Sequence, residues 1–391
     1  MMTVDTPHQI APRAASDDTR LQSVATRWAG VAFALAFVVT ALLTWGDRRP
    51  LAGEGSIGDI AAWSAAVAAG VAFGTTFVVE TSRGHAAWRQ RLPLAKRVVD
   101  VIAMTGAMVM LSYFIVLAAA NLFQLGFIGL TIDPLGGGVL AGAAAAAFAY
   151  AASLSGARVT SDGLATLATL VLFVGTMASM LSAPDESWWQ LHFSQLGNSA
   201  ALSGYRFNLA LIVTGIVLTA LAGYIGHDIE RGLVARGVPP RRTVSLLSWL
   251  FAGIGICLSI AGFVPDAVSF VVHVGAASGM VVVFGVFVFC ALRFLPGLPR
   301  EVASFSVLVI VGILIAAVLW VPIGYYNLTG MEFIAAGLLF AWLLVFVRAT
   351  AAYAQDPEAA RDPGAARDPE AARDPAYAQD AGAAQDAGDA P

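Results

Sequence analysis

The chain has 391 residues, of which 58% are hydrophobic and 12% charged, and its mean hydropathy is +0.75. A soluble domain carries roughly 45–50% apolar and about 25% charged residues, so this composition excludes an ordinary water-soluble enzyme. The charge is unevenly placed, because nine acids and three arginines lie from Gln355 onward. The rest of the chain is slightly basic, and its basic residues do not show the clustering that is typical of a nucleic-acid-binding protein. Membrane lipids are therefore the partners that the sequence favours.

The N-terminal segment 1–27 is polar and carries charges of both signs. It has no apolar core ahead of the first hydrophobic stretch, which is atypical of a cleavable signal peptide. We expect a short, disordered cytoplasmic leader.

Ten stretches are long and apolar enough to cross a bilayer, which takes about 20 residues per helix. No segment shows the alternation of a membrane β-barrel, so we expect an all-α, polytopic helical bundle. The fourth stretch is rich in alanine and could instead form a packed re-entrant piece. The predicted spans are Trp28–Trp45, Ile60–Val79, Val99–Phe123, Gly137–Leu154, Gly163–Leu181, Tyr205–Ile225, Val244–Val264, Ser269–Leu292, Phe305–Tyr326 and Met331–Val347.

The spans divide into a four-helix N-terminal part, residues 28–158, and a six-helix core, residues 162–350. The first part is rich in alanine and glycine, and the pair Gly70 and Gly74 suits close packing of helices. Polar residues gather at span ends only from Asp162 onward.

The orientation follows from the basic residues, which concentrate on the cytoplasmic side of membrane proteins. With a cytoplasmic N-terminus, 19 lysines and arginines lie inside, and Arg48, Arg49 and Arg206 lie outside. The pattern holds in every loop. It predicts a protein of the cell membrane with both termini in the cytoplasm.

The two cysteines, Cys257 and Cys290, fall inside predicted spans, so we interpret them as buried packing residues rather than a disulfide. Residues 355–391 form a six-residue repeat with proline in its first four units and few bulky apolar side chains. This composition predicts a disordered tail.

Polar and ionisable residues recur at one depth near the outer surface. The external loop contains His192 and Ser194, and four further span ends contribute Arg206, Asn208, Asp266, His273 and Glu332. Ionisable residues within spans are costly and often mark a site or an internal pair. We expect these seven residues to line an outward-facing pocket. The alternative is structural, with Arg206 and Glu332 forming an ion pair and His273 hydrogen-bonded to Asn208.

No cofactor or metal is predicted. The histidines and acids of this group have the ligand chemistry of zinc sites, but no two of them share a helix at the spacing of three or four residues. Ser194 with His192 two residues away is not a nucleophile motif, because the general base normally reaches the hydroxyl from elsewhere. We therefore interpret Ser194 as a capping or loop hydroxyl.

The segment His192–Gly197, followed by Tyr205–Asn208 at the start of a long helix, resembles the signature of a bacterial membrane family known as domain of unknown function 998. Downstream, Gly262–Pro265, then His273 and Glu332, resemble the related eukaryotic Frag/DRAM/Sfk group. The resemblance covers about residues 162–350 and implies a six-helix unit. The eukaryotic members are tied to lipid remodelling, lipid asymmetry or autophagy, and the bacterial family has no agreed activity.

Three functions remain open at this point. The first is binding of lipid headgroups or organisation of membrane lipids, with Arg206 paired to a phosphate. The second is a membrane-embedded hydrolase or transferase acting on a lipid, with His273 as general base and Glu332 or Asp266 orienting it. The third is a small-solute transporter, which is disfavoured because transporters place polar residues at the midplane. Whether the protein is an enzyme stays open.

Overall fold

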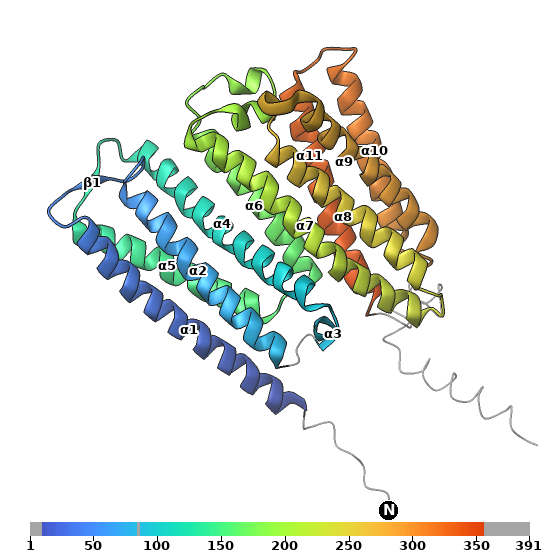
Figure 1. Ribbon diagram of the computed structural model, residues 1–391, viewed down its shortest axis with the longest axis horizontal. Helices are drawn as coiled ribbons and strands as arrows, with labels where there is room; N and C mark the ends of the chain where they lie inside the picture. Colours follow the sequence, from blue (N-terminus) through green and yellow to red (C-terminus); the bar gives the residue numbers. More distant parts are fainter. Residues whose placement is uncertain (1–9, 84–86, 356–391) are drawn as a thin grey trace, which may run out of the picture.

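The computed structural model describes residues 10–83 and 87–355, and over these ranges the protein is an all-α bundle (Figure 1). Ten of the described helices are long and apolar enough to cross a membrane, which confirms the predicted class of polytopic helical bundle. They are α1 (Ile10–Leu43), α2 (Ile57–Ser82), α4 (Leu94–Gly126), α5 (Pro134–Ala157), α6 (Ser161–Leu181), α7 (Leu202–Ala235), α8 (Arg241–Phe263), α9 (Asp266–Phe294), α10 (Arg300–Trp320) and α11 (Leu328–Tyr353).

The remaining elements are short. Helix α3 (Ala87–Gln90) lies between α2 and α4, and the two-residue strands β1 (Arg49–Pro50) and β2 (Thr131–Ile132) pair antiparallel. Several long helices begin at a side-chain cap, which satisfies backbone N–H groups that have no partner inside the helix. These caps are Ser56, Asp133, Thr160 and Asn327.

The expected disordered leader, residues 1–27, is wrong for its later part, because α1 already begins at Ile10. Polar side chains on this first part of α1 have partners on neighbouring helices, such as Arg20 with Glu80 of α2. These contacts add to those of a short apolar face, Leu21, Val24 and Ala25, whose side chains are partly or fully buried. Residues 1–9, and residues 356–391 of the predicted tail, lie outside the described residues.

Helices α1, α2, α4 and α5 pack together through small residues. The alanine-rich α5 is a continuous helix and contacts both α1 and α2, so the re-entrant alternative is wrong. Its residues Ala141, Ala145 and Ala149 are completely buried. A Cβ atom on Gly156 would come within 2.7 Å of the Phe73 carbonyl oxygen, so the backbones of α5 and α2 touch there.

Helices α6 to α11 form the second part, in which α7 packs against α6 and α8, and α8 packs against α9. Gly215 of α7 and Gly255 of α8 face each other so closely that a Cβ on either would collide with the carbonyl oxygen of the other. Helix α4 joins the two parts, because it contacts α6 and α7 as well as α2.

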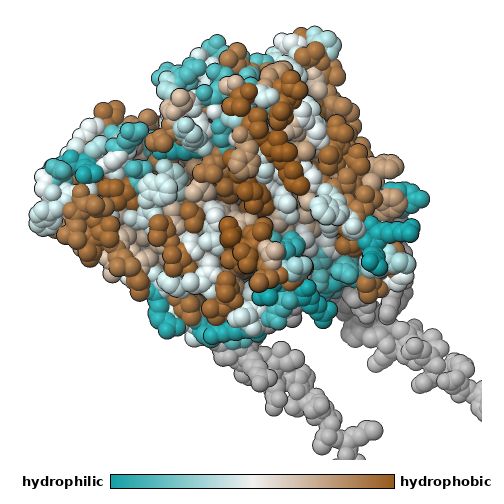
Figure 2. All heavy atoms as spheres, in the orientation of Figure 1, coloured by the Kyte–Doolittle hydropathy of each residue, from teal (hydrophilic) through white to brown (hydrophobic). Residues whose placement is uncertain are grey.

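The outside of the bundle is apolar over its middle, as expected of a surface that faces acyl chains. Figure 2 shows hydrophobic side chains across the middle of the visible face and hydrophilic ones toward its two ends. Exposed side chains on this surface include Val67, Ile102, Phe173 and Leu308. The described chain begins and ends at the same end of the bundle (Figure 1).

Candidate functional site

The loop between α6 and α7 folds into two short 3-10 helices, η2 (Trp188–Gln190) and η3 (Phe193–Asn198). We call residues 188–198 the cap, and the end of the bundle that carries it the cap end. Trp188 and Leu196 are buried against Phe207 of α7. Just before the cap, the Ser187 hydroxyl and backbone N–H donate to Asp185 at 2.6 and 2.8 Å, and these bonds hold the pKa of Asp185 below its usual value.

The end of α8 leaves backbone carbonyl oxygens free for other partners. The Ala261 carbonyl would normally accept from the N–H of residue 265, but Pro265 has none. His273 of α9, only 6% exposed, takes this place. Its Nδ1 lies 3.0 Å from the carbonyl oxygens of both Ala261 and Val264. The sequence Gly262–Pro265 thus builds an acceptor site for the imidazole.

These two contacts fix the role of each imidazole nitrogen. Carbonyl oxygens only accept, so Nδ1 of His273 carries the proton, and in the neutral ring Nε2 is then an acceptor. Nε2 lies 2.7 Å from the Ser194 hydroxyl oxygen, so the hydroxyl donates to it. A serine O–H that donates to a histidine with an oriented ring is the arrangement by which a general base activates a nucleophile.

The two acids near His273 do not orient it. Glu332 of α11 accepts from the Phe193 backbone N–H at 2.7 Å, which ties the cap to α11. Asp266, at the start of α9, lies 3.3 Å from Nε2 of His192. Glu332 is nonetheless close enough to interact electrostatically with both histidines and with Asp266.

Amide side chains complete the attachment of the cap. Asn208 of α7 donates to the Gly197 carbonyl at 2.9 Å, and a Cβ on Gly197 would collide with the Asn208 amide. Asn198 accepts from the Ala267 N–H at 3.3 Å. Asn327 donates to the Trp189 carbonyl at 2.6 Å. The cap is therefore held by α7, α9 and the start of α11 through neutral hydrogen bonds as well as through charged groups.

Arg206 turns toward the end of α6 and toward α4 of the four-helix part. Its guanidinium donates to the Ser182 hydroxyl, just after α6, at 3.2 Å and to the Tyr113 hydroxyl of α4 at 3.3 Å. No described hydrogen bond or salt bridge joins it to Glu332, and none joins His273 to Asn208. The structural alternative from the sequence therefore has the wrong partners for all four residues.

At the cap end, the buried Ser203 hydroxyl at the start of α7 has no hydrogen-bond partner among the residues that the structure describes, and neither have three further buried polar atoms. These three are Oδ1 of Asp266, the hydroxyl of Tyr326 and the hydroxyl of Thr329. Asp266 and Thr329 lie in the first turns of α9 and α11, and Tyr326 lies two residues before α11. An unpaired buried hydroxyl or carboxylate oxygen costs free energy, so these atoms are candidates for contacts with a polar ligand.

The structure thus brings Ser194 to His273, His192 to Asp266, and both Glu332 and Asn208 to the cap backbone. Sequence reasoning missed Tyr326 and Thr329 as site residues, and it missed Ser194 as the partner of His273. The available signal was Pro265, which frees a carbonyl of the preceding helix. Within the described ranges, no cluster of three or more histidine, cysteine or acidic residues has the geometry of a metal site.

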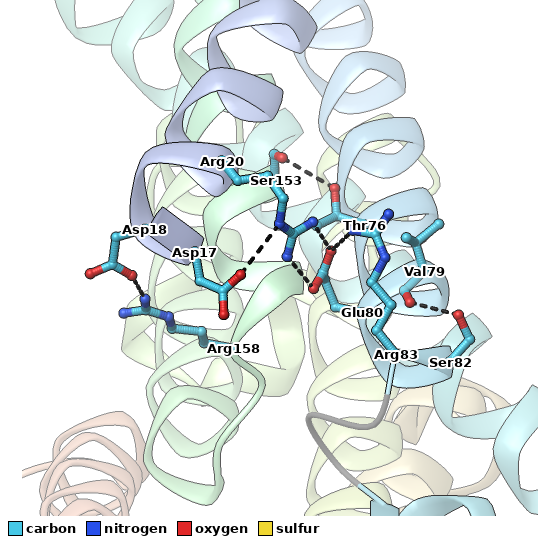
Figure 3. A network of polar contacts seen from close by, with 10 residues as sticks. All are labelled: Asp17, Asp18, Arg20, Thr76, Val79, Glu80, Ser82, Arg83, Ser153 and Arg158. Atoms are coloured by element: carbon cyan, nitrogen blue, oxygen red, sulfur yellow. Dashed lines mark hydrogen bonds and ion pairs between the residues drawn. The ribbon is translucent and has the colours of Figure 1, made fainter. Parts of the chain in front are cut away.

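A second polar network lies at the opposite end, in the four-helix part (Figure 3). Both guanidinium nitrogens of Arg20 donate to the Glu80 carboxylate at 2.9 Å, and Arg83 donates to the same group at 2.9 Å. Arg158 pairs with Asp18 nearby. Opposite charges face each other in this network, which suits it to holding helices together.

Comparison with protein-family models, with curated proteins and with solved structures finds no match. The resemblance to domain of unknown function 998 and to the Frag/DRAM/Sfk group therefore stays a prediction from short motifs. The structure itself defines the class as a multi-pass helical membrane protein.

Proposed function

We propose that this protein binds membrane glycerophospholipids at its cap end, and that this end faces the outside of the cell membrane. The sidedness is inferred from the 19 basic residues that fall on the other side of the ten spans. Residues of this end would then lie at headgroup depth in the outer leaflet.

The observation that carries the proposal is the set of unpaired buried oxygens at the start of α9 and α11. The hydroxyls of Tyr326 and Thr329 can donate to phosphate or ester oxygens, and Asp266 can accept from a headgroup hydroxyl or ammonium. Apolar side chains around the cap offer contacts for acyl chains. Trp189, Phe270 and Phe333 are all more than half exposed.

Arg206 lies outside this site, because its guanidinium is directed toward Ser182 and Tyr113. The ligand contacts come instead from hydroxyl and carboxylate oxygens. The proposed headgroup site therefore lies on the α9–α11 side of the cap.

The test uses protein in phosphatidylcholine nanodiscs that contain photoactivatable phosphatidylglycerol. The variant Tyr326→Phe/Thr329→Val removes two hydroxyls with little change of shape. We expect it to lower lipid capture by about 10-fold, the effect of losing one to two hydrogen bonds of about 1 kcal/mol. Tyr325→Phe is the matched control, because that neighbouring tyrosine is 77% exposed. Equal capture by all three proteins would contradict the proposal.

The sidedness is checked with single cysteines in a background lacking Cys257 and Cys290. Glu186 and Arg231 are both exposed and lie at opposite ends of the bundle. On intact cells, an impermeant maleimide should label Glu186→Cys and spare Arg231→Cys. The reverse pattern would contradict the outward orientation.

A further inference from the structure

We propose that Ser194 and His273 form a nucleophile and general-base pair that cleaves acyl esters. The assignment of the ester to a membrane lipid rests on the proposed lipid-binding function, whereas the pair itself rests on its own geometry. That geometry is the contact of 2.7 Å between the Ser194 hydroxyl and Nε2, with Nδ1 held 3.0 Å from two carbonyl oxygens.

The carbonyls of Ala261 and Val264 take the orienting role that a carboxylate fills in a catalytic triad. They lie at the C-terminal end of α8, where the helix dipole is negative and favours a positive charge on a nearby ring. The imidazolium that forms during proton transfer would be stabilised there. The carboxyl groups of Asp266 and Glu332 lie in the same region, where each contacts a residue of the cap.

The surroundings of the pair also suit this chemistry. His273 is buried, so its ring has a defined position, while Ser194 is only half-buried at the edge of the cap. The hydroxyl is therefore the more accessible of the two groups. Phe193, next to Ser194 in the chain, stacks on the exposed Phe333 of α11, so an apolar surface on which an acyl chain can pack lies beside the hydroxyl.

The reaction proceeds in two balanced steps. In the first, the Ser194 oxygen attacks the ester carbonyl carbon, Nε2 of His273 takes the hydroxyl proton, and the C–O bond of the ester breaks. The leaving alkoxide then takes that proton from Nε2 and departs as an alcohol, leaving an acyl-serine. In the second, water or another lipid hydroxyl attacks the acyl carbon while Nε2 of His273 takes its proton. The bond from that carbon to the Ser194 oxygen then breaks, and this oxygen takes the proton from Nε2, which restores the serine and releases a carboxylic acid or a new ester.

The first experiment asks whether Ser194 is activated. Protein in nanodiscs is treated with a fluorophosphonate probe, which forms a covalent bond only with an activated serine. We expect labelling of the native protein and none of Ser194→Ala. His273→Asn keeps a donor toward the α8 carbonyls but removes the base, and we expect it to slow labelling by about 100-fold or more.

Ser187→Ala is the matched control, since that serine lies in the same loop but donates to a carboxylate rather than to an imidazole. It should label at the native rate. No labelling of the native protein, or labelling that survives Ser194→Ala, would overturn the proposal.

A second variant tests the pair in case Ser194→Ala does not fold. In a background without Cys257 and Cys290, Ser194→Cys places a thiol against His273, which should raise its reactivity by favouring the thiolate. Iodoacetamide should alkylate it about 10-fold faster than Ser187→Cys, and His273→Asn should remove the difference. Equal alkylation rates in the two cysteine variants would also contradict the proposal that Ser194 and His273 act as a pair.

Two substrates separate this inference from the function on which it rests. Ser194-dependent hydrolysis of both p-nitrophenyl butyrate and phosphatidylglycerol in nanodiscs supports both proposals. Hydrolysis of the soluble ester alone supports the pair and contradicts the lipid assignment. If lipid capture occurs but neither ester is cleaved, the lipid-binding function stands and the catalytic pair is wrong.

Discussion

The two polar networks of this protein lie at opposite ends of the bundle and are built from different chemistry. In the four-helix part, Glu80 lies between Arg20 and Arg83, so buried negative charge meets positive charge directly (Figure 3). At the cap end, the Ser194 hydroxyl pairs with one nitrogen of the His273 imidazole, and the other nitrogen donates to backbone carbonyls.

The difference bears on what each network can do. The Glu80 carboxylate accepts three hydrogen bonds from two guanidinium groups, which stabilise its charged form and make it a weak base, and separating the charges would be costly. A serine–histidine pair needs only the transfer of one proton to create an oxyanion nucleophile. Both networks are buried, but their chemistry differs. The charged network suits a structural role, and the serine–histidine pair suits a chemical one.

The largest effect on folding is expected from Glu80→Gln in the first network. The change removes the negative charge of a side chain that is only 6% exposed, which leaves Arg83 without this partner and Arg20 with Asp17 alone, at 3.7 Å. We expect a loss of about 2–3 kcal/mol, less than for a fully buried pair because both arginines are partly exposed. The midpoint of thermal unfolding in detergent measures it.

Asp162→Asn is the control for this prediction, because Asp162 and Arg348 form an ion pair that is open to solvent. Its loss should cost less than about 0.5 kcal/mol. Serine labelling by the fluorophosphonate should be unchanged in both variants. Comparable destabilisation by the two substitutions would show that burial does not distinguish the first network.

A smaller loss of folding free energy is expected from Gly197→Ala in the cap. The added methyl would collide with the Asn208 amide and lie 3.1 Å from the Phe207 ring. Such overpacking costs about 1–3 kcal/mol, and it should also slow serine labelling because the cap carries Ser194. Gly275→Ala on α9 is the control, since its Cβ would meet no atom within 4 Å. Undiminished labelling in Gly197→Ala would mean that the cap does not position the serine.

The sequence predicted the number of spans because each helix crossing needs a fixed length of apolar chain. It also predicted a common depth for the polar residues of the cap end. It did not predict which of them meet, because depth says nothing about the angle around a helix axis. Arg206 and Asn208 illustrate this, since residues two apart on a helix point about 200° away from each other. One faces α4 and α6, and the other faces the cap.

The prediction of a disordered leader was wrong in its later part for a different reason. Its charges resemble those of a disordered segment, yet the part described in the structure continues α1, with Arg20 and Asp18 pairing across to α2 and to the end of α5. Composition alone treats such charges as solvated. Their partners lie 60 or more residues away in the sequence, beyond the reach of a local pattern.

The smallest effect on the free energy of unfolding is expected from Arg206→Met. This variant also tests most directly the contact between the two parts of the bundle. Because Arg206 donates to Ser182 and Tyr113, its loss should cost about 0.5–1.5 kcal/mol and loosen the contact of α7 with α4 and α6. Ser182→Ala should reproduce a fraction of that loss. Neither substitution should change capture of photoactivatable phosphatidylglycerol or labelling of Ser194, because no described bond links Arg206 to the cap. A 10-fold drop in lipid capture by Arg206→Met at unchanged stability would return this arginine to the phosphate-binding role predicted from its depth. The headgroup would then lie between the two parts of the bundle rather than over α9 and α11.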